Sequence, residues 1–142
     1  MIVDANILLY ARNSSDPRHE AARNWLEAAL NGDTRVGLPW STLGAFFRIA
    51  TNPRAFHDPL APDTAWQQVM DWLAAPSSWI PEPSDRYSRI LGQIVIEHRV
   101  TGPAMTDAML AALAIDHGVE LMSTDADFKA FEGLRHTDPL AD

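Results

Sequence analysis

The sequence has no cysteine and no long hydrophobic run. Without cysteine, neither disulfide bonds nor thiolate metal sites can form, and a reducing compartment is allowed. Without an apolar stretch of about 20 residues, we expect no membrane-spanning helix. No basic region precedes the apolar residues at the N-terminus, so a signal peptide is not expected either. These absences favour a cytoplasmic protein.

The chain does have the length and the apolar content of one folded domain. Its 142 residues, of which 46% are hydrophobic, suffice for a real core. We therefore expect a single domain over residues 1–142. No internal repeat, linker or low-complexity segment divides the sequence, and the Pro-containing stretch 54–62 is the loop that we expect to be most mobile.

Negative charge exceeds positive charge, and the excess lies in one part of the chain. The formal net charge of −8 argues against a simple basic nucleic-acid binder. Residues 1–54 carry six basic and five acidic residues, for +1, whereas residues 55–142 carry five basic and fourteen acidic residues, for −9. We expect cations or a basic partner to associate with the second part. For most of these acids, a solvated surface that aids solubility is the simpler interpretation.

Short apolar runs alternate with segments of helical periodicity. The run at residues 1–3 is typical of a buried parallel strand that leads into a helix. Further strands are predicted within 35–39, 78–81, 119–123 and 133–137. Helices are predicted to begin at Asp16-Pro17, after Trp40-Ser41-Thr42, at Pro62, after the cap Ser84 and after the cap Thr106. This alternation predicts an α/β fold with a mostly parallel central sheet flanked by helices.

Two helices have a predicted packing. On the helix that begins at Pro62, we expect Trp66, Val69, Met70 and Leu73 to face inward. The helix over 107–117 is almost wholly apolar, so we expect it to be buried nearly all round.

Four aspartates occupy places that would bring them to one edge of such a sheet. Asp4 ends the first strand, Asp125 follows the strand at 119–123, Asp127 comes two residues later, and Asp107 opens the apolar helix. Ligands bind at the carboxyl ends of strands in open α/β sheets. If the first strand and the strand before Asp125 are neighbours, the four carboxylates share one crevice.

Carboxylates that crowd together repel one another, and a hard divalent cation relieves the repulsion. Mg²⁺ and Mn²⁺ prefer oxygen ligands, and Mg²⁺ keeps several of its waters. A bound ion of this kind polarises phosphoryl oxygen and lowers the pKa of a bound water, which is the chemistry of hydrolysis without a covalent intermediate. The five histidines are scattered without ligand spacing, which argues against a His-based zinc site.

Each aspartate also has a purely structural interpretation. Asp4 is placed to cap the following helix, which for this residue alone is the simpler interpretation. Asp107 would add negative charge to a first helical turn. Asp125 and Asp127 would form a turn and cap before the next helix. The coincidence of all four at one predicted edge favours a shared site.

These motifs, in this order, resemble the signature of the PIN-domain nucleases. The segments that carry the resemblance are Ile2-Val3-Asp4-Ala5-Asn6, Thr106-Asp107 and Ser123-Thr124-Asp125-Ala126-Asp127-Phe128. Two further segments, 38–42 and 46–54, resemble VapC toxins, the ribonuclease halves of bacterial type II toxin–antitoxin pairs. The resemblance runs from residue 1 to about residue 131.

The resemblance implies a three-layer PIN-like fold whose central sheet has four to five strands. It implies an endoribonuclease that depends on Mg²⁺ or Mn²⁺ and hydrolyses RNA phosphodiester bonds with metal-activated water. A VapB-like antitoxin as inhibitory partner and a homodimer are implied as well. By position, the implied metal ligands, directly or through water, are Asp4, Asp107 and Asp125. The other implied catalytic residues are Asp127, which completes the acidic cluster, and Asn6 and Thr124, which would orient carboxylates or waters.

Arginines and tryptophans supply candidate contacts to RNA. Arg12, Arg48 and Arg54 lie after predicted strand ends or beside the mobile loop, and the guanidinium fork matches phosphate oxygens. For any one of them, a surface salt bridge is the simpler interpretation. The five tryptophans are at positions 25, 40, 66, 72 and 79. They could stack on bases, but for those at helical spacing a place in the core or in a dimer interface fits better.

One feature of the family is missing. Many members have a glutamate on the helix after the second strand, where this sequence reads Leu43-Gly44-Ala45-Phe46, and no acidic residue occurs between Asp33 and Asp58. One alternative is therefore a degenerate, non-catalytic PIN-like module that only binds a partner. Another is a phosphoacceptor receiver domain, which also gathers aspartates around Mg²⁺. That domain requires a lysine on a late strand, whereas the only lysine, Lys129, falls on a predicted helix.

Overall fold

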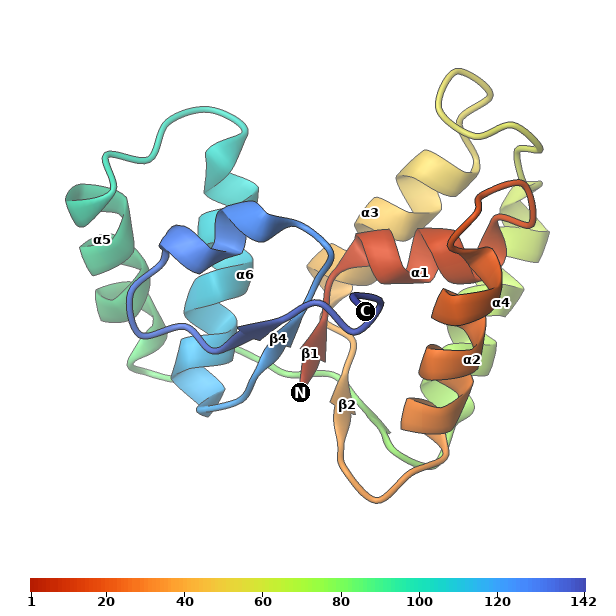
Figure 1. Ribbon diagram of the computed structural model, residues 1–142. Helices are drawn as coiled ribbons and strands as arrows, with labels where there is room; N and C mark the ends of the chain where they lie inside the picture. The colour runs from red at the N-terminus through yellow and green to blue at the C-terminus, as the bar shows by residue number, and fades with distance from the viewer.

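The computed structural model describes residues 1–142. It consists of a five-stranded parallel sheet with helices on both faces (Figure 1). The strands are β1 (Ile2–Val3), β2 (Val36–Gly37), β3 (Ser78–Trp79), β4 (Leu121–Met122) and β5 (His136–Thr137), in the order β3-β2-β1-β4-β5. The helices are α1 (Ala5–Arg12), α2 (His19–Leu30), α3 (Trp40–Ala50), α4 (Pro62–Ala74), α5 (Tyr87–Glu97), α6 (Ala104–His117) and the 3-10 helix η1 (Ala126–Ala130). The predicted α/β fold with a parallel sheet of four to five strands is confirmed.

Each face of the sheet has its own apolar core. Ile2 is paired with Leu121, and both belong to the core under α5 and α6. Val3 is paired with Met122, and both belong to the core under α1 to α4. Successive strand residues point to opposite faces, so a strand covered on both sides needs an unbroken apolar run. This is why the central strands read as continuous hydrophobic segments.

The apolar helix α6 is buried along most of its length, as its sequence predicted. It ends at Gly118, where a φ of 64° places the backbone in the left-handed region that glycine adopts without strain. Its start differs from the prediction. The helix begins at Ala104, and no side chain caps it, so the capping role expected of Thr106 is wrong. None of the helices is both long and apolar enough to cross a bilayer.

Two other helices, α2 and α5, begin later than predicted, after a turn that contains the expected cap residue. The side chain of Asp16 accepts hydrogen bonds from Arg18, and α2 begins only at His19. The hydroxyl of Ser84 donates to Asp116, and α5 begins at Tyr87. In both cases the side chain accepts from the amide two residues ahead, Asp16 from Arg18 and Ser84 from Arg86, so it closes a turn just before the helix instead of capping the helix itself.

Two tryptophans form an exposed apolar surface on α3 and α4. Trp40 and Trp66 are 48% and 49% exposed, and their rings are nearly parallel, with centroids 6.3 Å apart. A shallow cavity of about 260 Å³ beside them is also lined by Leu43, Gly44 and Phe47. The prediction that Trp66 faces inward is wrong. The buried tryptophan of α4 is Trp72, whose ring meets Phe46 edge-on.

A buried carboxylate fastens the segment before α5 to the end of α6. Asp116 is 4% exposed and accepts hydrogen bonds from the amide of Ser84, at 2.8 Å, and from its hydroxyl. The Arg86 guanidinium lies 3.7 Å from the same carboxylate. Burial by itself would raise the pKa of Asp116, but the Ser84 hydrogen bonds, with His117 and Arg86 nearby, bring the pKa below its ordinary value.

We expect Asp116→Ala to lower the free energy of unfolding at neutral pH by roughly 1.5–3 kcal/mol, the range for hydrogen bonds to a charged group. Because the pKa of Asp116 is lowered on folding, its contribution is present above the ordinary carboxyl pKa and is lost as the pH falls through the lowered value. Urea unfolding at pH 7 and at acidic pH measures both effects. The exposed Asp33 provides the control Asp33→Ala. If Asp116→Ala lowered the free energy of unfolding by the same amount at both pH values, the charge of Asp116 would not be the cause.

Candidate functional site

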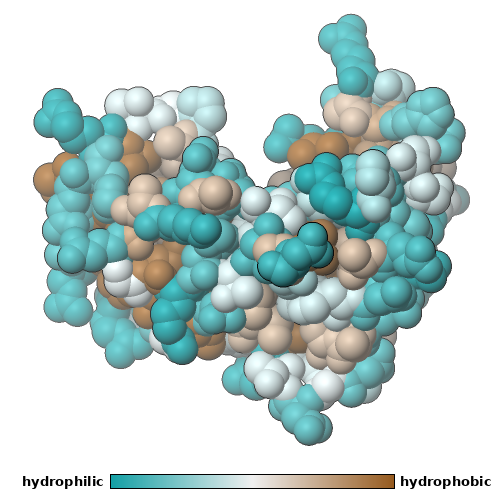
Figure 2. Space-filling model, in the orientation of Figure 1, coloured by the Kyte–Doolittle hydropathy of each residue, from teal (hydrophilic) through white to brown (hydrophobic).

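The two central strands bring aspartates to the same edge of the sheet. β1 and β4 are parallel neighbours, with Val3 opposite Met122. The amide of Asp4 donates to the carbonyl of Met122 at 2.9 Å, so the pairing continues to the residue that follows β1. The adjacency that a shared crevice requires is therefore present. Space-filling shows the molecule hollowed between the α5–α6 side and the α1–α3 side, above the carboxyl ends of these strands (Figures 1 and 2).

Ser123 is fully buried, and its hydroxyl joins three residues of this edge. The hydroxyl donates to Oδ2 of Asp4 at 2.7 Å. It accepts from the side-chain amide of Asn6 at 3.2 Å and from the backbone amide of Asp125 at 3.1 Å. A hydroxyl donates one hydrogen bond and accepts two, so its capacity is used in full. Ser123 thus fixes Asp4, Asn6 and Asp125 relative to one another.

From the sequence, Thr124 is the expected orienting hydroxyl, yet the hydrogen bonds to Asp4, Asn6 and Asp125 belong to Ser123. A signal for Ser123 was available. It is a hydroxyl residue at the end of an apolar, buried run, and a buried polar group requires partners. A contact between Thr124 and water stays a prediction.

The structural roles foreseen for the aspartates are present as well. Asp4 caps α1, with Oδ1 accepting from the Ala5 amide at 2.7 Å. Asp125 precedes η1, and its Oδ1 accepts from the Asp127 amide at 2.9 Å. Asp107 lies in the first turn of α6. A carboxylate offers about four acceptor positions, so these contacts leave capacity for a ligand.

The carboxylates also act on one another electrostatically. Burial raises the pKa of Asp4 above its ordinary value, against the hydrogen bonds from Ser123 and Ala5, and the charge of Asp125 raises it further. Burial likewise raises the pKa of Asp107, and the charges of Asp4, Asp125 and Asp127 add to the effect. The four aspartates therefore lie in one electrostatic neighbourhood, although they are far apart in the chain.

The chemistry of this donor set suits a hard divalent cation. Besides the carboxylates, the side-chain oxygen of Asn6 is buried and has no hydrogen-bond partner, so it is a free acceptor for a cation or its water. No three Asp, Glu or His side chains lie close enough together to hold one ion directly. Mg²⁺ is commonly bound through one or two carboxylates and keeps several waters. The arrangement therefore fits ligation partly through water rather than a closed set of three carboxylates.

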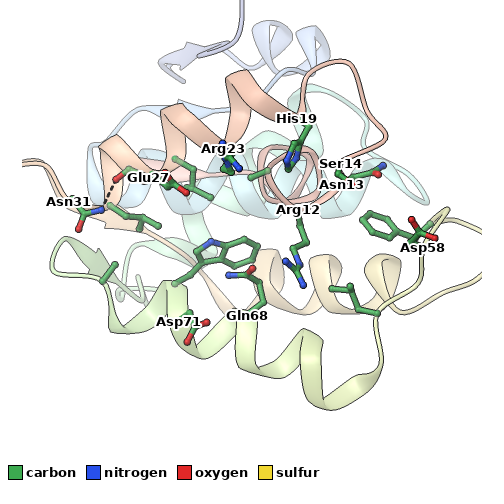
Figure 3. Close-up of a pocket in the computed structure, with 17 residues that line it drawn as sticks. Arg12, Asn13, Ser14, His19, Arg23, Glu27, Asn31, Asp58, Gln68 and Asp71 are labelled. Carbon is green, nitrogen blue, oxygen red and sulfur yellow. Dashed lines mark hydrogen bonds between the residues drawn. The ribbon is translucent and has the colours of Figure 1, made fainter.

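The candidate phosphate-binding arginines lie away from the carboxylates. Arg12 ends α1 and Arg48 is in the last turn of α3, each roughly 10–12 Å along its helix from the end at the sheet edge. Arg12 lines a cavity of about 610 Å³ between α1, α2 and α4. Within it, the Arg12 side chain extends from α1 toward Gln68 of α4 (Figure 3).

None of the three candidate arginines has an acidic partner. The ion pairs of the chain are Arg18 with Asp16 and Arg86 with Asp116. The salt-bridge interpretation of Arg12, Arg48 and Arg54 is therefore wrong. All three are exposed, and their guanidinium groups are free for an external anion.

Known proteins resemble this chain over nearly its whole length. The model of the PIN domain family matches residues 1–134. The chain is 44% identical over 140 residues to Ribonuclease VapC37 of Mycobacterium tuberculosis, covering 99% of this chain and 97% of that protein. It is 36% identical to Ribonuclease VapC33 of the same organism, again over 140 residues, with 99% and 98% covered.

Solved structures share the fold at low sequence identity. VapBC2 from Rickettsia felis, bound to a DNA fragment from its promoter, superposes with a TM-score of 0.71 at 17% identity, covering 96% of each chain. The Mycobacterium tuberculosis toxin VapC20, described as cleaving the Sarcin-Ricin loop, superposes with a TM-score of 0.66 at 16% identity, covering 94% of this chain and 98% of that one. These likenesses establish the same architecture in both.

Proposed function

The chain belongs to the PIN domain family, and from this premise we propose that it is a metal-dependent endoribonuclease, the toxin of a type II toxin–antitoxin pair. A relative named as a ribonuclease, 44% identical over almost the whole chain, supports the activity. The observation that carries the proposal is the gathering of Asp4, Asp107, Asp125 and Asp127 in one electrostatic neighbourhood at the carboxyl ends of β1 and β4.

In this proposal, Asp4, Asp107 and Asp125 hold Mg²⁺ or Mn²⁺, directly or through water, and Asp127 adds negative charge. When bound, the ion supplies positive charge for the phosphoryl group and lowers the pKa of water for hydrolysis of the RNA phosphodiester bond. The chain itself provides orientation, since the Ser123 hydroxyl holds the Asp4 carboxylate. Burial and mutual repulsion oppose the charged carboxylates, and a cation relieves both effects.

The net charge of −8 repels RNA, so the overall charge of the protein does not favour RNA binding. We therefore assign RNA binding to local groups of positive charge. Arg12 and Arg48 are the proposed phosphate contacts, with Arg54 beside them in the chain's first, less acidic part. Arg12 ends α1 and Arg48 is in the last turn of α3, and both helices lead away from the carboxylate edge. A strand of several nucleotides would therefore be needed to reach both the carboxylates and the arginines.

The proposed inhibitory partner is a VapB-like antitoxin in the cytoplasm. Solved structures with this fold include toxin–antitoxin complexes. The charge of −9 in residues 55–142 favours a partner with a basic segment. Reading the neighbouring open reading frames for a small DNA-binding protein supplies the candidate, and co-expression with that candidate tests the pairing, because growth should recover and the two proteins should purify together. Growth inhibition that persists when the two proteins are co-expressed would count against the pairing.

A homodimer of single-domain subunits, each spanning residues 1–142, is part of the same proposal. The exposed apolar surface of α3 and α4 supports it. At Gly44, an added Cβ would meet nothing within 4 Å, so the backbone of α3 is open to close approach by a second helix. Sedimentation velocity of the purified protein decides this point, and a monomer at micromolar concentration would remove the dimer from the proposal.

Cleavage of structured RNA by antitoxin-free protein tests the central claim. We expect no cleavage after treatment with EDTA and recovery on addition of Mn²⁺ or Mg²⁺. Mn²⁺ should also raise the melting temperature, since a ligand at 100 times its Kd stabilises the folded state by about 2.7 kcal/mol. Calorimetry measures the binding directly.

A second candidate function is a non-catalytic PIN-like module that binds only a partner. It is favoured by the lack of any acidic residue between Asp33 and Asp58, where many family members have a glutamate. The same experiment separates the two functions. Protein that binds its antitoxin but neither binds Mn²⁺ nor cleaves RNA is the binding module.

A further inference from the structure

We propose that His136, on the edge strand β5, is a positioning residue that holds the carbonyl of Ser123 and so fixes the turn that carries Asp125. The inference rests on the proposed function, in which Asp125 is a metal ligand. His136 belongs to neither the carboxylate set nor the candidate arginines. Its role follows from where its ring lies in the sheet.

The ring reaches the point at which β4 leaves the sheet. Pairing between β4 and β5 ends with Met122 opposite Thr137, and the Ser123 amide donates to the Thr137 carbonyl at 3.1 Å. The Ser123 carbonyl is then bonded at 2.8 Å to Nε2 of His136. A side chain therefore supplies the hydrogen bond that a longer strand would have supplied from its backbone.

The partner determines the tautomer. A carbonyl oxygen can only accept, so Nε2 of His136 carries the proton. The other ring nitrogen, Nδ1, is buried without a hydrogen-bond partner. The ring lies near that of Phe128, with centroids 6.0 Å apart. An apolar ring would fill this space without burying an unpaired nitrogen, so the hydrogen bond to Ser123 is what distinguishes histidine here.

Ser123 is the residue at which such a contact has most effect on the site. Its amide and carbonyl are both held from β5, and its hydroxyl contacts Asp4, Asn6 and Asp125. Holding the carbonyl fixes the peptide plane that follows Ser123, and with it the direction in which the chain enters the Asp125 turn. Without His136, a buried carbonyl loses its partner and the turn is free to rotate.

Two substitutions separate the donor from the ring. His136→Phe keeps an aromatic ring and removes the N–H, whereas His136→Gln keeps an N–H near the position of Nε2. In metal-free protein, we expect the amides of Asp125 and Asp127 to exchange hydrogen about tenfold faster in the Phe variant and at nearly the wild-type rate in the Gln variant. Mn²⁺ affinity, measured by calorimetry, should fall roughly 10–100-fold in the Phe variant and recover in the Gln variant.

His98 provides the matched control. The His98 ring meets the Phe131 ring edge-on, with centroids 5.3 Å apart. The His98 side chain makes no hydrogen bond to Ser123 or to the aspartates. His98→Phe should leave both the exchange rates and the Mn²⁺ affinity unchanged.

Several results would overturn the role of His136. The first is a His136→Phe variant whose amide exchange rates and Mn²⁺ affinity equal those of the wild type. Another is a Gln variant as impaired as the Phe variant, which would show that packing against Phe128 is what matters. A third is faster exchange throughout the chain, which would show general destabilisation. Exchange is measured without metal, so failure of the wild type to bind Mn²⁺ would count against the proposed function and leave the positioning role to be decided by exchange.

Discussion

Asp4→Asn should abolish RNA cleavage while the protein remains folded. Asparagine keeps the shape of the side chain and one of its two oxygens, so it can still accept the hydrogen bond that the Ala5 amide donates to Oδ1, but not the one that the Ser123 hydroxyl donates to Oδ2. It removes the negative charge that a divalent cation requires. We expect the rate to fall at least about 10³-fold, because metal ions supply several kcal/mol of charge stabilisation to phosphoryl transfer. Cleavage of a structured RNA under single-turnover conditions measures the change.

The stability of the same variant separates a catalytic from a structural role. The pKa of Asp4 is raised in the folded protein, chiefly by burial, so the folded state binds the proton more tightly than the unfolded state does. Ionisation of Asp4 therefore destabilises the metal-free fold as the pH rises through the raised pKa. Asp4→Asn should consequently melt at the wild-type temperature or above it near neutral pH, without metal.

Metal and a matched control complete the experiment on Asp4. The rise in melting temperature that Mn²⁺ causes in the wild type should be largely lost in Asp4→Asn. Asp33→Asn, a change at an exposed aspartate, should behave as the wild type in all three measurements. Wild-type cleavage by Asp4→Asn would remove Asp4 from the catalytic set, and a large fall in its metal-free melting temperature would show that the residue is mainly structural.

The sheet edge could be predicted because burial leaves a direct trace in the sequence. A strand covered on both faces is an unbroken apolar run, and the run stops where the strand meets solvent, which is where Asp4 and Asp125 stand. The pairing of Ile2 with Leu121 and of Val3 with Met122 places both ends at one edge. The sequence therefore located the two strand ends, and the pairing of β1 with β4, which the sequence left as a condition, brings them to the same edge.

Other features depend on contacts that no local pattern contains. Ser84 is a good cap residue by type, but its hydroxyl donates to Asp116, 32 positions away, and accepts from the Arg86 amide in the turn before α5. Trp66 and Trp72 are both plausible inward positions on α4, and Trp72 is buried because Phe46 of α3 lies against it. Local propensity sets which residues are able to cap or to pack. The tertiary partner decides which of them do.

Tertiary contacts also decide whether Ser123 or Thr124 orients the carboxylates, and the substitution Ser123→Ala tests this. The substitution removes the donor to Asp4 and the acceptor of the Asn6 and Asp125 amides. With buried groups left unpaired, we expect the free energy of unfolding to fall by about 1–3 kcal/mol. RNA cleavage and Mn²⁺ affinity should fall roughly 10–100-fold, the usual range when a residue that orients a metal ligand is lost.

Thr124→Ala is the comparison that gives this result its meaning. Both variants delete one hydroxyl from neighbouring residues at the same sheet edge. If the hydrogen bonds of Ser123 orient the carboxylates, Ser123→Ala should lose more Mn²⁺ affinity than Thr124→Ala does. Loss of the hydrogen bond from Ser123 to Asp4 should also raise the pKa of Asp4 further. Carboxyl NMR titration of the metal-free protein would detect this rise. The reverse order, with Thr124→Ala the weaker binder of Mn²⁺, would return the orienting role to Thr124. It would also mean that the Ser123 network holds the fold together without controlling the ion.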